Sequence, residues 1–328
     1  YDTYSVSRAQ WWSERFTSKE YPSIEKGLIQ RKKYINFLPT GISGIAFNSL
    51  EEPFNDIRVR EAFCHLWDVE KLMDKLFFNE YVRKRSYFPR SKYEHPENPI
   101  QDYNPDYALE LLNQAGWSKK QGEKWLTNKD GEIFEIKEFH IYQGWDRILN
   151  SFVQDLENVG IKLNLVVIQN PFEKAMNRKF KLYNGGWTAS LLPSPEGMLH
   201  SKFSEKMDVT NITGMANPEI DKIIEKYNLE WDMNKRITLL QQIDSLATRE
   251  YHWAFGWGAP YGYRSLTWNK FGMPESGISY NGSWLDPIKY WWIDPDKKSK
   301  LQQVLKNETL SLPIEEEIID YWNTLNKN

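Results

Sequence analysis

Residues 133–167 read IFEIKEFHIYQGWDRILNSFVQDLENVGIKLNLVV, and this stretch decides the fold. Its first ten residues are predicted to form a strand, and its last seven alternate in polarity, with Ile161, Leu163, Leu165 and Val167 on one face. Between them, apolar residues recur three or four positions apart, which predicts a helix that ends at Gly160. Two strands joined by a helix form a parallel pair, so the sequence predicts an α/β fold.

Three further helices are indicated by their ends as well as by their apolar spacing. A capping asparagine followed by proline opens two of them, at Asn104–Pro105 and at Asn217–Pro218, and Gly116 suits the end of the first. The third covers residues 232–249. Strands and helices alternate over residues 44–253, which predicts a sheet flanked by helices.

The last part of the chain differs in amino-acid composition. Glycine, proline and serine become frequent after Tyr251, and few helix signals remain before residue 280. Residues 298–328 are predicted to form one or two amphipathic helices split at Pro313. The acidic run that starts at Glu315 is typical of a solvated face.

Length and charge exclude several classes of protein. At 328 residues the chain exceeds the roughly 250–300 residues that one hydrophobic core covers, so two packed units are expected. With 42 basic and 45 acidic residues the net charge is −3, which leaves no basic field for nucleic acid. The longest uncharged stretches, residues 183–195 and 251–263, are shorter than the roughly 18 apolar residues of a spanning helix. We therefore expect a protein that does not itself span a membrane.

The sequence also lacks the motifs of common catalytic and metal sites. Its five histidines are far apart, and none has the spacing of a metal ligand set. The motifs of nucleotide, dinucleotide and acyl-transfer sites are missing. Cys64, the one cysteine, lies in a helical pattern and is expected to be a small buried apolar residue. We therefore predict no metal, no cofactor and no enzymatic activity.

Aromatic residues make up 15% of the chain, which is a positive signal for binding. Aromatic rings offer flat apolar area and lose little rotamer entropy when they are fixed, so they recur in ligand clefts. They also build ordinary cores, and both interpretations stay open at this point.

Four segments, in order over residues 44–260, resemble the family 5 extracellular solute-binding proteins, the dipeptide- and oligopeptide-binding components of ABC importers. The first is FNSLEEPFNDIRVREAFCHLWDVEKL at residues 47–72, in which Asp56 is expected to cap a helix, with Arg58 and Arg60 in water. The others are YNPDYALELLNQAGW at 103–117, LENVGIKLNLVVIQNPFEKAMNRKFKLYNGGW at 156–187, and the helix at 232–249 with the strand after it. LFFNEYVRKRSYFP at 76–89 is similar to the YejA-like oligopeptide and microcin-uptake branch.

The resemblance implies an α/β, periplasmic-binding-protein-like two-lobe fold of type II that closes on its ligand. Residues 48–255 would form a complete second lobe. The first lobe would be partial, built from residues 1–47 and from residues 256–328 with a helical tail. Segments 44–48 and 255–261 would run side by side as the connection between lobes. The chain would then be the C-terminal part of the full protein, with its signal sequence outside this chain.

The function implied is the binding of an oligopeptide for uptake, without chemistry. The implied partners are a peptide or peptide-like ligand and the ABC permease subunits. The implied location is periplasmic or extracytoplasmic, associated with the membrane through the transporter.

The loop that follows residue 182 holds the best candidates for ligand contact. Gly185 and Gly186 suit β-like pairing with an extended peptide, although glycine also serves turns for conformational reasons alone. Trp187 is either a cleft wall or a core residue. Ser190 stands where many family members carry an aspartate that pairs with the peptide ammonium group, and a neutral hydroxyl cannot replace that charge.

Further candidates come from three other places. Tyr142, Gln143 and Trp145 follow a strand, at the edge where open α/β sheets bind ligands. Asn48 stands at the end of another strand. The second crossing between lobes contributes an aromatic and basic group, Trp257, Tyr261 and Arg264. Arg264 is either a ligand contact or, as we favour, half of a surface ion pair.

Two other functions compete with peptide uptake. The tryptophans leave open an aromatic-lined carbohydrate-active or carbohydrate-binding protein, which would need paired carboxylates in a groove for hydrolysis. The other alternative is a protein-interaction or chaperone-like relative of the binding proteins. The sequence does not identify the ligand.

Overall fold

The computed structural model describes residues 2–325, which divide into two compact units. The first unit comprises Tyr1–Pro39, Met73–Val82 and Ala259–Asn328, and the second comprises Thr40–Leu72 and Arg83–Gly258. These divisions lie at 39/40 and 258/259, whereas the lobes were expected to divide at 47/48 and 255/256. How the units correspond to lobes stays a prediction. Within the described residues, no helix combines the length and the apolar character needed to cross a membrane.

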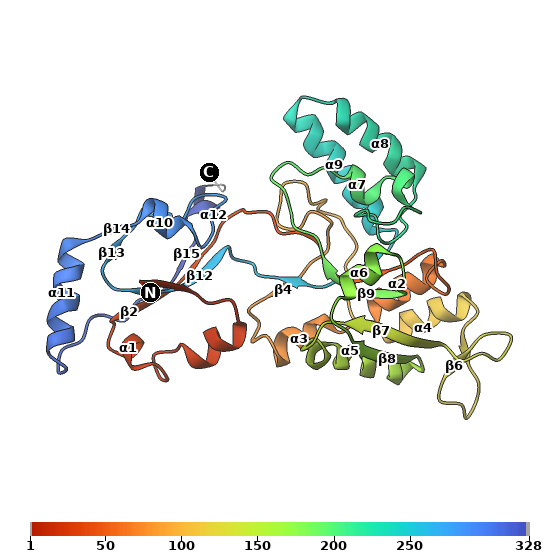
Figure 1. Ribbon diagram of the computed structural model, residues 1–328, viewed down its shortest axis with the longest axis horizontal. Coiled ribbons are helices and arrows are strands. Elements are labelled where there is room, and N and C mark those ends of the chain that lie inside the picture. The colour runs from red at the N-terminus through yellow and green to blue at the C-terminus, as the bar shows by residue number, and fades with distance from the viewer. Residues whose placement is uncertain (1, 326–328) are drawn as a thin grey trace. The chain divides into compact units, whose positions relative to one another are not determined.

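The predicted strand–helix–strand unit is present in the second unit (Figure 1). Strand β7 (Glu135–Ile141) pairs in parallel with β8 (Lys162–Val167), and α5 (Asp146–Val159) joins them. Gly160 ends α5 with φ of +94°, in the left-handed region that glycine tolerates. Val167 continues the predicted alternation with Leu163 and Leu165 but is not buried. It is the last residue of β8, and 53% of its surface is exposed.

A second sheet of three strands carries the candidate site. Its order is β10–β3–β9, with β3 (Ser43–Phe47) between β10 (Trp253–Phe255) and β9 (Leu182–Gly186). Both pairings are antiparallel. Phe255 is opposite Gly44, so the two predicted segments meet at that pair, but residues 45–47 pair with residues 252–254 and not with 256–261. Their role as a connection between lobes stays a prediction.

Helix α2 (Ile57–His65) follows β3 and shows one correction. Asp56 caps it as predicted, because its carboxylate accepts a hydrogen bond from the N–H of Arg58 at 2.9 Å. Arg60 was expected in water, but it is buried at 4% exposure. Its guanidinium donates to the carbonyl oxygens of Phe54 and Glu250 at 2.8 and 3.0 Å, so backbone carbonyls replace its water shell. Cys64, as expected, is buried.

The predicted helical caps are confirmed in the rest of this unit. Asn104 caps α4 (Pro105–Gln114) and Asn217 caps α8 (Pro218–Leu229), as predicted. Asp232, where the third predicted helix begins, caps α9 (Met233–Thr248). Helices α8 and α9 lie side by side (Figure 1) and pack apolar residues into one core with β3 and β10. The shorter elements are α3 (Val69–Lys75), β4 (Val82–Arg83), β5 (Ser118–Lys119), β6 (Leu126–Thr127), α6 (Pro171–Met176), α7 (Glu196–Leu199), the 3-10 helix η2 (Ser201–Phe203) and β11 (Trp257–Gly258).

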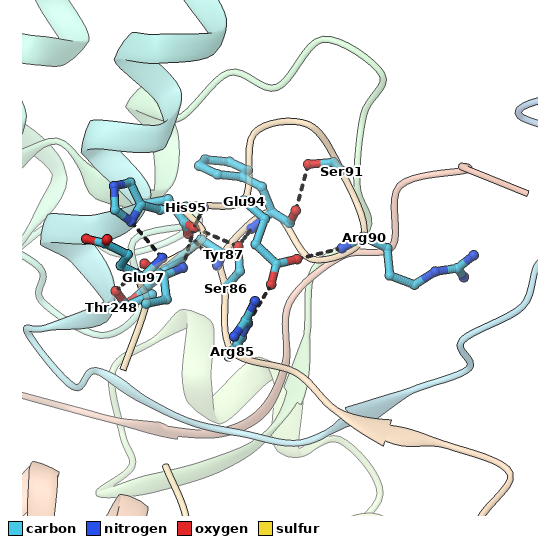
Figure 2. A network of polar contacts seen from close by, with 12 residues as sticks. Arg85, Ser86, Tyr87, Arg90, Ser91, Glu94, His95, Glu97 and Thr248 are labelled. Atoms are coloured by element: carbon cyan, nitrogen blue, oxygen red, sulfur yellow. Dashed lines mark hydrogen bonds and ion pairs between the residues drawn. The ribbon is translucent and has the colours of Figure 1, made fainter. Parts of the chain in front are cut away.

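A polar network holds residues 85–98 against α9 (Figure 2). The buried carboxylate of Asp244 accepts hydrogen bonds from the Ser86 hydroxyl at 2.8 Å and from the Asn98 amide at 2.6 Å. It also accepts from the backbone N–H groups of Tyr87 and His95, at 2.8 and 2.9 Å. Burial raises the pKa of the Asp244 carboxyl, and these four donors oppose that shift. One carboxylate on α9 therefore fixes the path of a segment that has no regular structure.

The first unit contains a four-stranded sheet of order β1–β12–β2–β15. Strands β1 (Thr3–Ser5) and β2 (Ile29–Tyr34) come from the start of the chain, and β12 (Tyr263–Trp268) and β15 (Glu316–Ile319) come from its end. The other elements are the π-helix η1 (Trp11–Arg15), α1 (Pro22–Glu25), β13 (Phe271–Gly272), α10 (Asp286–Tyr290), β14 (Trp292–Ile293), α11 (Pro295–Lys306) and α12 (Tyr321–Leu325).

The tail differs from its prediction after Pro313. Helix α11 is present, but the acidic run forms strand β15, which pairs in parallel with β2, in place of the predicted helix. The glutamates of β15 are exposed, as expected of a solvated face. Lys32 contacts Glu315 and Glu317 at 3.0 Å each. The glutamates that suggested a solvent-exposed helix therefore form ion pairs with basic residues of the neighbouring strand, β2. Residues 326–328, also predicted as helix, lie outside the described residues.

Candidate ligand-binding site

Strand β9 is the outer strand of its sheet, and its register decides which backbone groups remain for a ligand. The N–H of Asn48 donates to Lys181 O at 3.1 Å, and the N–H of Trp187 donates to Ile42 O at 2.9 Å. In an antiparallel pair, hydrogen-bonded and non-bonded positions alternate. Gly185 therefore directs its N–H and C=O groups to β3, whereas Gly186 directs its groups to the opposite edge. Of the two glycines predicted for peptide pairing, the register makes Gly186 the one that faces outward.

The glycines also have a packing role. A Cβ atom on Gly185 would collide with the Tyr183 ring, and one on Gly186 would collide with the carbonyl oxygen of Ile42. Burial raises the pKa of Tyr183 to about 12, with a further contribution from the nearby Tyr142. Close packing therefore requires both glycines, and their pairing with a peptide backbone stays a prediction.

Trp187 continues from β9 and is partly buried. It packs against the core formed by α8, α9 and β3, and its ring meets Phe172 edge to face at 5.8 Å between centroids. Its indole nitrogen Nε1 is buried and has no hydrogen-bond partner among residues 2–325. Trp187 is thus partly a core residue, and its role as a cleft wall stays a prediction.

The loop after Trp187 offers no unengaged carboxylate. Ser190 is exposed, and its hydroxyl accepts a hydrogen bond from Leu192 N at 3.3 Å. Glu196 is paired with Lys202 and accepts from Asn228 Nδ2 at 3.1 Å. The hydrogen bond from Lys202 lowers the pKa of the Glu196 carboxyl. The one acid of this loop is therefore already engaged within the second unit.

The other predicted residues of the second unit fall into two groups. Trp145 and Trp257 are brought together, with ring centroids 6.2 Å apart. Gln143 is exposed beside them at the end of β7. Asn48, by contrast, is buried, and its side-chain amide donates to Phe180 O at 3.0 Å and accepts from Leu50 N at 3.2 Å. The side chain of Asn48 thus forms hydrogen bonds with backbone groups next to the end of β3.

Tyr261 and Arg264 belong to the first unit and are buried there. Arg264 was expected in a surface ion pair, but its side chain is only 2% exposed and lies 3.4 Å from Glu80. It also donates to the carbonyl oxygens of Val6 and Ser7 at 2.9 and 2.8 Å. The guanidinium ties the start of the chain to β12, which gives it a structural role.

One residue that the sequence analysis missed lies at the other side of β3. The Lys84 ammonium group donates to Gly41 O at 2.6 Å and to Ser43 Oγ at 2.9 Å. Burial lowers the pKa of Lys84 to about 8, and the positive charge of Arg90 acts in the same direction. The available signal was the basic run Arg83–Arg85, whose members the sequence alone does not distinguish.

Comparisons with known proteins agree with this picture. A family model described as bacterial extracellular solute-binding proteins, family 5 Middle, matches residues 9–208. The uncharacterized protein YejA of Escherichia coli K12 is 24% identical, over 93% of this chain and 55% of that protein. This similarity agrees with the YejA-like branch expected from the sequence.

Solved structures show the fold. The oligopeptide-binding protein AppA from Bacillus subtilis, in complex with a nonapeptide, matches with a TM-score of 0.69 and 19% identity, covering 89% of this chain and 56% of AppA. A mannohexaose-bound oligopeptide-binding protein from Thermotoga maritima matches with a TM-score of 0.62 and 18% identity, covering 81% and 52%. The predicted α/β, periplasmic-binding-protein-like fold is confirmed. The chain spans about half the length of the proteins it matches.

Proposed function

The chain belongs to the family 5 bacterial extracellular solute-binding proteins, and we propose that it takes part in binding an oligopeptide outside the cytoplasm for delivery to the permease of an ABC importer. The ligand is bound and released without chemical change. The protein's contact with the membrane is through the permease subunits, and its location is periplasmic or extracytoplasmic.

The backbone of Gly186, which the register turns away from β3 at the end of β9, is the observation that carries this proposal. An extended peptide adds to a strand edge through main-chain hydrogen bonds, which are independent of the peptide's sequence. Gly186 turns its backbone groups to that edge, and Trp187, Trp145 and Trp257 supply flat apolar area in the same unit. A transport protein that accepts many peptides needs this combination.

Mass spectrometry tests the proposal directly. The protein is purified natively, without added ligand, and the small molecules released by acid are identified. We expect peptides of mixed sequence at a stoichiometry approaching one per protein. Release of oligosaccharides in place of peptides would favour the carbohydrate-binding alternative. The mannohexaose-bound protein from Thermotoga maritima is an example of this fold with such a ligand.

A pair of tryptophan variants links the bound peptide to β9. Trp187→Ala is expected to lower the amount of released peptide at least several-fold, since it removes the ring next to Gly186. Trp231→Ala is the matched control, because Trp231 is 89% exposed at the turn between α8 and α9. Thermal unfolding of both variants shows whether each still folds. Equal peptide content in folded Trp187→Ala and Trp231→Ala would contradict the placement of the site at β9.

A further inference from the structure

Lys84 is a partly buried cation with no carboxylate partner. Its ammonium group has three N–H donors, and two of them go to the neutral oxygens of Gly41 and Ser43. Among residues 2–325, no aspartate or glutamate oxygen lies within 4.0 Å of it to form an ion pair. One donor and the full positive charge therefore remain for another group.

The basic residues on either side of Lys84 have carboxylate partners. Arg83 is paired with Glu70 at 3.3 Å and donates to the carbonyl oxygens of Cys64 and Trp67. Arg85 is paired with Glu94 at 3.1 Å (Figure 2). Glu94 also accepts a hydrogen bond from the backbone N–H of Arg90 at 3.0 Å. Within this basic run, the fold supplies carboxylates to Arg83 and Arg85 and supplies none to Lys84.

Leaving a charge partly desolvated and without a counter-charge is unfavourable for the protein alone. The lowered pKa of Lys84 expresses that cost. The cost is offset when an anion arrives, because a charge-assisted hydrogen bond then forms in a place of reduced water access. An arrangement of this kind is typical of a functional position.

The location of Lys84 connects it to the peptide site. Its two acceptors flank the start of β3, and Ser43 is the register partner of Gly186. Gly41 packs against the Trp187 backbone so closely that a Cβ atom there would collide with it. The Lys84 stem lies against Gly258, at the end of β11. The ammonium group is thus held at the start of β3, on Ser43, the residue that lies opposite Gly186.

We propose that Lys84 binds a carboxylate group of the ligand at the start of β3, so that the second unit recognises an anionic group. This inference rests on the proposed function, since it names the chemical class of the same ligand. It is consistent with the neutral Ser190 and the engaged Glu196 in the loop after β9. The carboxylate is either the C-terminus of the peptide or an acidic side chain.

Three mixed-sequence tetrapeptide libraries separate these two sources. The first has free C-termini and contains no Asp or Glu, the second is the same library with amidated C-termini, and the third is amidated but contains Asp and Glu. Binding is measured by native mass spectrometry and calorimetry on ligand-stripped protein. A C-terminal contact predicts that the first library binds about 10 to 100 times more tightly than the second, which is the range expected for one charge-assisted hydrogen bond. A side-chain contact predicts that the third library binds more tightly than the second.

Lys84→Met tests whether the lysine is responsible. It keeps most of the side-chain volume and removes the charge, so it is expected to abolish the preference for carboxylate-bearing libraries. Lys84→Arg, which keeps a charge, is expected to retain part of the preference. Lys222→Met, at an exposed position of α8, is the matched control and is expected to keep all of it.

The outcomes separate this inference from the function it rests on. If none of the libraries binds the unmodified protein, the proposed function fails and this inference fails with it. If the libraries bind equally well, or if folded Lys84→Met keeps the preference, peptide binding stands and the role of Lys84 is refuted. Circular dichroism and thermal unfolding establish that each variant is folded before its binding is compared.

Discussion

At the scale of single residues, Ser190 has the clearest consequence for ligand choice. It lies in an exposed loop where many family members place an aspartate, and Glu196 is engaged with Lys202 and Asn228. A buried ammonium group needs an ionised or multiply hydrogen-bonded partner, because an unpaired buried charge costs several kcal/mol. The loop after β9 therefore provides no charged partner for a peptide N-terminus.

We predict that N-acetylated peptides bind about as tightly as free peptides. The comparison is made by calorimetry with one peptide in both forms. Ser190→Asp is expected to create a preference for the free amine, and Ser190→Asn, which adds similar volume without charge, is its control. A strong loss of binding on acetylation, together with a ligand-bound structure that places Glu196 on the amine, would refute this prediction.

His252 gives a prediction for the dependence of stability on pH. It is buried, its Nδ1 has no hydrogen-bond partner among residues 2–325, and burial together with the nearby Arg60 lowers its pKa well below 6.5. Below that pH the unfolded chain takes up a proton that the folded protein does not, so this residue makes stability fall as pH decreases. Its contribution is about 1.4 kcal/mol per pH unit at most.

Urea unfolding at pH 7.5 and at pH 5.0 measures this effect. His252→Leu removes the titrating group while keeping an apolar side chain in the buried position, so the difference in stability between the two pH values is expected to shrink. An unchanged difference in the variant would mean that other groups determine the pH dependence.

The residues that sequence reasoning misjudged share one property. Arg60 and Arg264 were expected in water, yet both are buried on backbone carbonyls supplied by distant segments. The Lys84 site was missed for the same reason, since its acceptors are about 40 residues away in the chain. The sequence shows that a residue is charged and therefore prefers water. It does not show which backbone oxygens will accept its hydrogen bonds in place of water, because folding brings those oxygens from distant segments.

At the scale of elements, the sequence predicted most where the signal was local. Capping side chains and the spacing of apolar residues lie within one helix, so α4, α8 and α9 were predicted with their first residues. Strand β15 was not, because its acidic residues are stabilised by β2, almost 300 residues away. The order β10–β3–β9 likewise depends on contacts between remote segments.

The central strand of that sheet is expected to be highly sensitive to substitution at Gly44. This residue has φ of +151°, and a Cβ atom there would collide with the Ala254 carbonyl oxygen of β10. Gly44→Ala is expected to lower the free energy of unfolding by about 2–4 kcal/mol, because neither backbone can move without breaking the ladder. Gly116→Ala is the control, since Gly116 also has a positive φ, +92°, but has open space around it.

Denaturant unfolding of both variants checks the comparison. The control is expected to lose only about 1 kcal/mol, the cost of a left-handed residue without a clash. Similar losses in the two variants would show that backbone conformation, and not the approach of β10, determines the need for glycine at Gly44.

At the scale of the whole molecule, the chain covers about half the length of the relatives it matches. If ligand is closed between two lobes, affinity depends on contacts from both. We therefore predict that residues 1–328 alone bind a given peptide at least tenfold more weakly than a longer form extended to the length of those relatives. Calorimetry with one peptide on both forms measures the difference, and equal affinities would show that these residues contain the complete site.

The arrangement of strands in the first unit also sets an order for folding during synthesis. The two neighbours of strand β2, β12 and β15, are made more than 200 residues after it. Residues 40–258 are complete before either neighbour exists, so the second unit has all its own strands first. Strand β2, with its basic residues, must therefore wait for β12 and β15 before these two pairings can form.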